Sequence, residues 1–130
     1  MPRTFPEEPL FSDEKSEGRI VCTRILDTIS RSKSSAGYLQ GMNCIVACLY
    51  FHAGEVLAYE FAIRVLNDYH LKEVVMPKFP GLSTHTDVIQ KLMEHALPEL
   101  HQHFKLLKID VSIFCQNWIM TLFTQVIPLR

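Results

Sequence analysis

The stretch SAGYLQGMNCIVACLYFH, residues 35–52, decides the fold of this 130-residue chain. Beyond Gln40 and Gly41 its residues are almost wholly apolar, and none of them carries a formal charge. A helix that is hydrophobic on all sides needs neighbours on all sides, so it belongs in the middle of a helical domain. The sequence therefore predicts a buried central helix from about Tyr38 to His52, with a polar amide directly ahead of its apolar run.

Helical periodicity continues on both sides of this central segment. Residues 19–31 form a predicted helix with one apolar face, made of Val21, Cys22, Ile25, Leu26 and Ile29. Gly54 interrupts the pattern, and residues 55–69 then predict a further helix whose inward side chains are Leu57, Phe61, Val65 and Tyr69.

The second half of the chain also predicts helices. Residues 70–82 contain two prolines and a glycine and indicate a loop with a short turn. Thr84, followed by Asp87, is typical of an N-cap and opens a helix through about Leu97, after which Pro98 starts another. Asp110 is placed to cap a last helix that ends at Pro128, with the apolar stripe Val111, Phe114, Trp118, Leu122 and Val126.

Together these patterns predict an all-α fold of about five to six packed helices. Residues 1–18 contain three prolines and a glycine and are expected to form an extended or turning lead-in, while residues 19–130 are expected to be helical.

Composition excludes several functional classes. Thirteen basic and fourteen acidic residues are interspersed and give a net charge of −1, whereas nucleic-acid binding requires clustered Lys and Arg. The longest apolar run, residues 44–51, is too short to span a bilayer, and the polar, proline-rich N-terminus does not resemble a signal peptide. We therefore expect a cytoplasmic protein that neither binds nucleic acid nor inserts directly into a membrane.

Four cysteines are spread along the chain at positions 22, 44, 48 and 115, without the spacing typical of zinc sites. We expect reduced, buried thiols. Cys44, Cys48 and His52 recur every four residues and so share a helical face, which leaves open a metal site completed by a fourth ligand.

Two polar residues stand out from this apolar background. Arg3 lies between Pro2 and Pro6, which stiffen the backbone, and Gln40 lies between glycines that permit another backbone to approach closely. In phosphoryl transfer an arginine neutralises charge on the transferring group, while a glutamine amide orients the attacking water. The alternative interpretations are a solvated terminal arginine and a helix-capping or turn amide.

Three segments in order along the chain, PRTFP (2–6), GYLQGMN (37–43) and NWIMTLFTQVIPL (117–129), resemble the TBC domain, the GTPase-activating module for Rab proteins. That family shows an IxxDxxRT motif, a YxQG motif and then a helix containing Trp. The first half of the first motif would precede Met1. The resemblance implies that residues 1–130 are a partial TBC domain lacking the N-terminal and C-terminal parts.

The resemblance also implies a mechanism. Arg3 matches the arginine finger and Gln40 the glutamine finger, both supplied in trans to a Rab-family small GTPase in its GTP form. Thr4, Gly37, Tyr38 and Gly41 would support the two loops: the glycines allow close approach, and Tyr38 either packs beneath Gln40 or is a core residue.

The chain would then be a regulator and not an enzyme, with no cofactor of its own, because GTP and Mg²⁺ belong to the partner. It would be peripheral on endomembranes only through the Rab. Two alternatives remain open: a non-catalytic TBC-like scaffold or GTPase-binding module, inactive because truncated, and an unrelated helical enzyme that depends on a cysteine or a metal.

Overall fold

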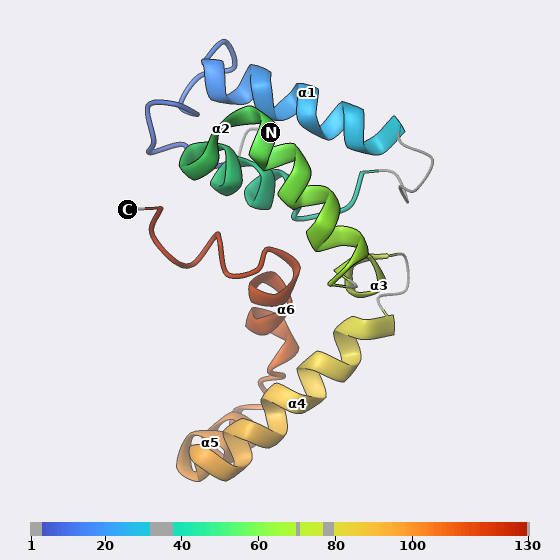
Figure 1. Cartoon of the computed structure of the whole chain (residues 1–130). Coiled ribbons are helices and arrows are strands. Elements are labelled where there is room, and N and C mark those ends of the chain that lie inside the picture. Colours follow the sequence, from blue (N-terminus) through green and yellow to red (C-terminus); the bar gives the residue numbers. More distant parts are fainter. Residues whose placement is uncertain (1–3, 32–37, 70, 77–79, 130) are drawn as a thin grey trace.

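The computed structural model describes residues 4–31, 38–69, 71–76 and 80–129, and within these residues it contains six helices and no strand. The all-α prediction is confirmed. The helices are α1 (Glu17–Arg31), α2 (Met42–Asn67), α3 (Leu71–Val75), α4 (Pro80–Ala96), α5 (Pro98–Leu107) and α6 (Ser112–Met120). Figure 1 shows α1 lying along α2 at one end, while α4 and α5 extend away and α6 returns toward α2.

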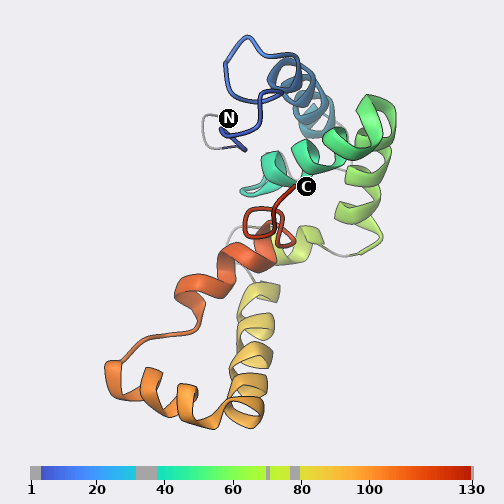
Figure 2. The same ribbon diagram turned by 90° about the vertical axis from the view of Figure 1, so that its left-hand side faces the viewer.

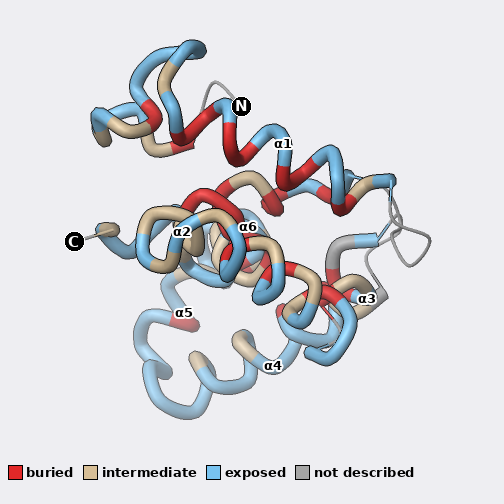
Figure 3. Tube along the Cα trace, turned by 45° about the horizontal axis from the view of Figure 1, so that its top comes forward, coloured by how far each residue is buried: buried red, intermediate tan, exposed pale blue. Residues whose placement is uncertain are grey.

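The core lies mainly between α1 and α2. All five residues of the predicted apolar face of α1 are buried, as Figure 3 shows for the tube of that helix. They pack with the first half of α2, where Val46 and Ala47 are fully buried. The central apolar helix thus has the buried position that its composition predicts.

The segment called α2 is two helices joined at Gly54, whose φ of 76° and ψ of 178° are not helical. A straight helix would place Met42 and Leu66 about 36 Å apart, at 1.5 Å per residue. Both residues nevertheless line one small internal cavity, so the second half folds back along the first. Figure 2 shows this bend in the green part of the chain. The predicted break at Gly54 is confirmed.

By length and mean hydropathy alone, α2 is the one helix in the described ranges that is apolar enough to cross a membrane. A core helix of a soluble protein passes the same test. The break at Gly54 divides this segment into two shorter helices that pack on each other.

The predicted inward face of residues 55–69 is wrong by one position. Leu57, Phe61 and Tyr69 are about half or more exposed, Val65 is half-buried, and the buried residues are instead Ala58, Ala62 and Leu66. Small alanine side chains let the returning half of α2 approach its neighbours closely. Side-chain size therefore misled the prediction, because the largest residues lie on the outer surface.

Two helix boundaries in the second half also differ from the prediction. Residues 71–75 form the short helix α3 within the expected loop, and α4 begins at Pro80, so Thr84 lies inside a helix and is not its N-cap. Pro80 and Pro98 both occupy the first position of a helix, where a missing N–H costs nothing. The predicted start at Pro98 is confirmed.

The last helix is shorter than predicted. The Asp110 carboxylate accepts a hydrogen bond of 2.7 Å from the Ser112 N–H, and hydrogen bonds from the Ser112 side chain and backbone lower the pKa of Asp110. The N-cap of α6 is nevertheless Val111, with no side-chain cap, so the predicted cap at Asp110 is one residue early. α6 then ends at Met120, because Leu122 and Phe123 take positive φ angles of 49° and 62° and turn the chain. As a result Leu122 and Val126 are exposed and do not continue the apolar stripe.

The lead-in before α1 is held by packing and not by regular structure. Phe11 is fully buried, and its ring lies 6.0 Å from that of Phe5 and 6.4 Å from that of Tyr50 on α2. The buried Arg19 side chain donates a 2.6 Å hydrogen bond from Nε to the Phe11 carbonyl oxygen. These contacts fix the residues that directly follow Arg3.

Candidate functional site

Two of the predicted site residues, Arg3 and Gly37, lie outside the described residues. The other four, Thr4, Tyr38, Gln40 and Gly41, are described, and they come from two segments far apart in the sequence. These four residues lie at or close to the start of α2.

Gln40 is exposed at a tight turn just before α2. The turn is closed by a 3.2 Å hydrogen bond from the Met42 N–H to the Leu39 carbonyl oxygen, and both Leu39 and Met42 are buried. The N-cap of α2 is Gly41, and no side chain caps this helix, so Gln40 does not have the capping role considered as an alternative. Its amide is presented outward between two anchored apolar residues.

Gly41 makes this turn possible in two ways. Its φ of 93° is a conformation that L side chains rarely adopt. A Cβ at this position would also lie only 2.6 Å from the carbonyl oxygen of Met120 at the end of α6. The expected close approach of another backbone is confirmed for Gly41, and that backbone belongs to the chain itself.

Thr4 and Tyr38 meet at a residue that the sequence analysis did not single out, Asn43 in the first turn of α2. The Asn43 amide donates from Nδ2 to the Thr4 hydroxyl at 2.7 Å, and Thr4 is fully buried. The Tyr38 hydroxyl donates to Asn43 Oδ1 at 3.1 Å. One amide thus joins the segment that follows Arg3 to the segment that precedes Gln40.

The core position considered for Tyr38 is wrong, because the residue is 58% exposed. Its hydroxyl bond to Asn43 links it to the first turn of α2. Partial burial and the neighbouring Cys44 raise the pKa of Tyr38, so the hydroxyl keeps its proton and stays a donor at neutral pH.

The tail after α6 forms a third side of this region. Gln125 donates from Nε2 to the Cys44 Sγ at 2.9 Å, and Asn43 Nδ2 lies 3.4 Å from the same sulfur. Burial raises the pKa of the Cys44 thiol, and the two amide donors oppose that shift. Gln125 was not predicted as a site residue either; its place in the NWIMTLFTQVIPL segment gave only a family resemblance.

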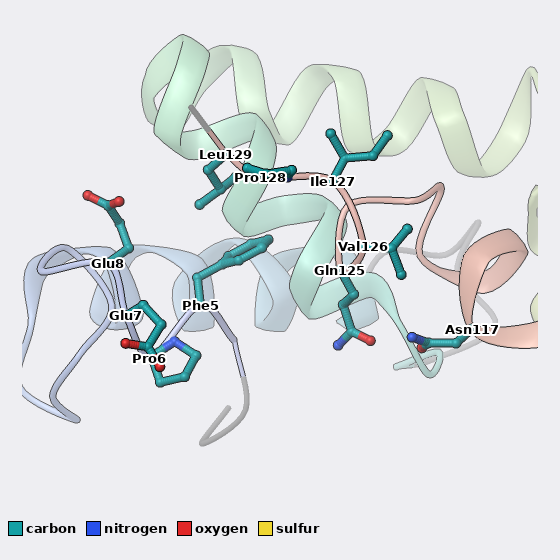
Figure 4. A pocket seen from close by; sticks show the side chains of 10 residues that line it. All are labelled: Phe5, Pro6, Glu7, Glu8, Asn117, Gln125, Val126, Ile127, Pro128 and Leu129. Atoms are coloured by element: carbon teal, nitrogen blue, oxygen red, sulfur yellow. The ribbon is translucent and has the colours of Figure 1, made fainter. Parts of the chain in front are cut away.

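Beside these contacts lies an open pocket of about 630 Å³ between the lead-in and the tail. Figure 4 shows the lead-in side chains on one side of it and the tail side chains on the other. The lining residues are Phe5, Pro6, Glu7, Glu8, Asn117, Gln125, Val126, Ile127, Pro128 and Leu129. The pocket thus lies between the lead-in and the tail, and Gln40 is not among the residues that line it.

The cysteines belong to the packing of the molecule. Cys22, Cys44 and Cys115 are buried, as expected, whereas Cys48 is only half-buried. Burial raises the pKa of Cys22 to about 12. Among the described residues no group of three His, Cys, Asp or Glu side chains is arranged to hold a metal ion, and this includes Cys44, Cys48 and His52.

Comparison with known proteins agrees with the motifs. The family model for the Rab-GTPase-TBC domain matches residues 1–130, the whole chain. The chain belongs to the Rab-GTPase-TBC domain family. This TBC chain is 29% identical over 129 residues to the Rab GTPase-activating protein eat-17 of Caenorhabditis elegans, covering 99% of the chain and 14% of that protein.

Two further relatives also match nearly the whole chain. The TBC chain is 28% identical to the human ecotropic viral integration site 5 protein homolog, over 98% of the chain and 16% of the relative. It is 27% identical to TBC1 domain family member 4 of Mus musculus, over 98% of the chain and 10% of the relative. The chain therefore spans a small part of the length of these relatives.

Proposed function

We propose that this chain accelerates GTP hydrolysis by a Rab-family small GTPase, with Arg3 and Gln40 supplied in trans as an arginine finger and a glutamine finger. The observation that carries the proposal is the Asn43 amide, which hydrogen-bonds both Thr4 and Tyr38. These residues directly follow Arg3 and closely precede Gln40, so the two motifs meet at one place although they are far apart in the sequence.

Each finger would perform a separate task. The guanidinium of Arg3 is planar and permanently charged, and it would stabilise negative charge that develops on the γ-phosphoryl oxygens. The Gln40 amide, exposed at its turn, would orient the attacking water. An arginine finger contributes about 10³ to 10⁵ in rate, which corresponds to about 4–7 kcal/mol of activation free energy at about 1.4 kcal/mol per decade.

The surroundings of the two motifs fit this task. Neighbouring residues hold the backbone on both sides of the Gln40 turn, while the amide itself stays accessible. The adjoining pocket is open and combines apolar with polar side chains, a composition suited to contact with a protein surface. GTP and Mg²⁺ would enter with the partner, and the chain would reach endomembranes from the cytoplasm through the same partner, without inserting into the bilayer.

Single-turnover GTP hydrolysis by a panel of GTP-loaded Rab-family GTPases tests the proposal. We expect wild-type chain to stimulate at least one GTPase, Arg3→Ala and Arg3→Lys to lose about 10³-fold or more of the stimulation, and Gln40→Ala to lose about 10²-fold. Arg64→Ala and Gln102→Ala, at exposed positions of α2 and α5, are matched controls and should keep the stimulation.

Circular dichroism of every variant shows whether a loss of stimulation reflects a loss of fold. If folded wild type and Arg3→Ala stimulate equally, the finger mechanism is refuted. If the folded wild-type chain binds a GTPase without stimulating it, the chain is a non-catalytic binding module.

A further inference from the structure

Asn43 is the only residue of the described site that hydrogen-bonds to both predicted finger segments. It lies in the first turn of α2, where the neighbouring helical residues are apolar and buried, and its side chain is half-buried. Its Nδ2 donates to Thr4 at 2.7 Å and its Oδ1 accepts from Tyr38 at 3.1 Å. An amide suits this position because it carries a donor and an acceptor on one planar group.

The two contacts restrict the backbone next to each finger. Thr4 is fully buried, and its bond to Asn43 fixes the backbone at the described residue that directly follows Arg3 in the sequence. Tyr38 is exposed, and in the described residues its hydroxyl bond to Asn43 is the polar contact that attaches it to α2. Gln40 follows two residues later, held below by the buried Leu39.

We propose that Asn43 is a positioning residue that holds the arginine and glutamine segments in a fixed position relative to each other, so that the side chains of Arg3 and Gln40 reach the same nucleotide. This inference rests on the proposed function. Asn43 does not itself touch the nucleotide. Its effect is geometric: catalysis falls steeply when a group is misplaced, and a displacement of about 1 Å can cost about 10²-fold in rate.

A set of substitutions separates positioning from general stability. Asn43→Ala removes both hydrogen bonds to the finger segments and also the 3.4 Å contact with the Cys44 Sγ. Thr4→Val removes only the bond to Thr4 while preserving side-chain shape, and Tyr38→Phe removes only the bond to Tyr38. Thr4→Ser restores the hydroxyl lost in Thr4→Val. Asn67→Ala, an exposed asparagine at the opposite end of α2, is the matched control.

Two quantities are measured for each variant. The first is the maximal stimulated hydrolysis rate, and the second is the concentration of the 130-residue chain that gives half-maximal stimulation. We expect Asn43→Ala to lower the maximal rate by about 10²-fold and to change the half-maximal concentration by less than about threefold, because binding contacts elsewhere remain. Thr4→Val and Tyr38→Phe should each lower the maximal rate, and Thr4→Ser should recover most of the loss.

A double-variant comparison tests the connection between the two segments. If Asn43 joins them, adding Thr4→Val or Tyr38→Phe to Asn43→Ala should cause almost no further loss, because each bond is already absent. Losses that multiply independently would overturn the proposal, as would an Asn43→Ala variant with the wild-type maximal rate.

Hydrogen exchange of the full chain provides a second measurement that does not depend on hydrolysis. Asn43→Ala should speed amide exchange in both residues 4–8 and residues 38–41, with exchange in α1 unchanged. If only one segment responds, or neither does, the connection is refuted even where the wild-type chain stimulates a GTPase. If the wild-type chain stimulates no GTPase but both segments respond, the proposed function fails while the connection through Asn43 is supported.

Discussion

The contact between Gly41 and the end of α6 leads to a quantitative prediction for Gly41→Ala. A methyl group here would be strained twice, first because φ is 93° and second because Cβ would meet the Met120 carbonyl oxygen at 2.6 Å. Unfavourable backbone dihedrals cost about 1–3 kcal/mol, and overpacking a tight site costs a further 1–3 kcal/mol or so. We expect Gly41→Ala to lower the free energy of unfolding by about 2–6 kcal/mol.

Gly54→Ala is the matched control. Gly54 also has a positive φ, 76°, but a Cβ there would meet no atom within 4 Å. This substitution therefore introduces the backbone strain without the collision, and its expected cost is about 1–3 kcal/mol.

Urea and thermal unfolding followed by circular dichroism measure both costs. For a chain of this length each kcal/mol corresponds to a fall in Tm of roughly 3–6 °C, so Gly41→Ala should lower Tm by roughly 6 °C or more. A loss of less than about 1 kcal/mol would refute the argument, because neither the positive φ nor the Met120 carbonyl would then constrain the turn that carries Gln40.

Two further predictions concern stability. The Cys22 thiol of the unfolded chain has the ordinary pKa of 9.0, whereas burial raises the pKa of the folded thiol to about 12, so the free energy of unfolding should fall as pH rises through that window. Urea unfolding of Cys22→Ala should show a shallower fall, and parallel curves would contradict the assignment. The exposed ion pair between Arg24 on α1 and Glu55 on α2 joins Nη2 to Oε1 at 2.6 Å. Because solvent screens such pairs, Glu55→Gln should lower the free energy of unfolding by less than about 1 kcal/mol in the same assay. A larger loss of stability would contradict that reasoning.

Local patterns were sufficient to predict the all-α fold and several of its parts. The apolar face of α1, the break at Gly54 and the start of α5 at Pro98 each depend on residues within a few positions of one another. Such features follow from helical periodicity and from the dihedral limits of glycine and proline. For this reason they could be read from the sequence.

Features that depend on tertiary packing could not be read in the same way. Side-chain size favoured Leu57 and Phe61 as inward residues, but Ala58 and Ala62 are buried because the two halves of α2 pack closely. Continuous periodicity likewise extended α6 too far, since the positive φ angles at Leu122 and Phe123 are not marked by glycine.

The sequence likewise predicted only those residues of the candidate site that local patterns mark. Gln40 and Gly41 were marked locally by a polar residue beside glycine in an apolar stretch. Asn43 and Gln125 acquire their roles only through contacts with Thr4 and Cys44, residues distant in the sequence. An asparagine at the start of a helix gives no local sign of such a partner.

The hydrogen bonds around the start of α2 also determine when this region can form during folding. Thr4 and Asn43 are 39 positions apart, and Cys44 and Gln125 are 81 apart, so each bond closes a long loop of chain. Closing long loops has an entropic cost that short-range helix formation does not have, and contacts of high sequence separation form slowly. During refolding, helical circular dichroism should therefore recover before the turn at Gln40 acquires its native hydrogen bonds, and a chain that is already helical would still lack the assembled site.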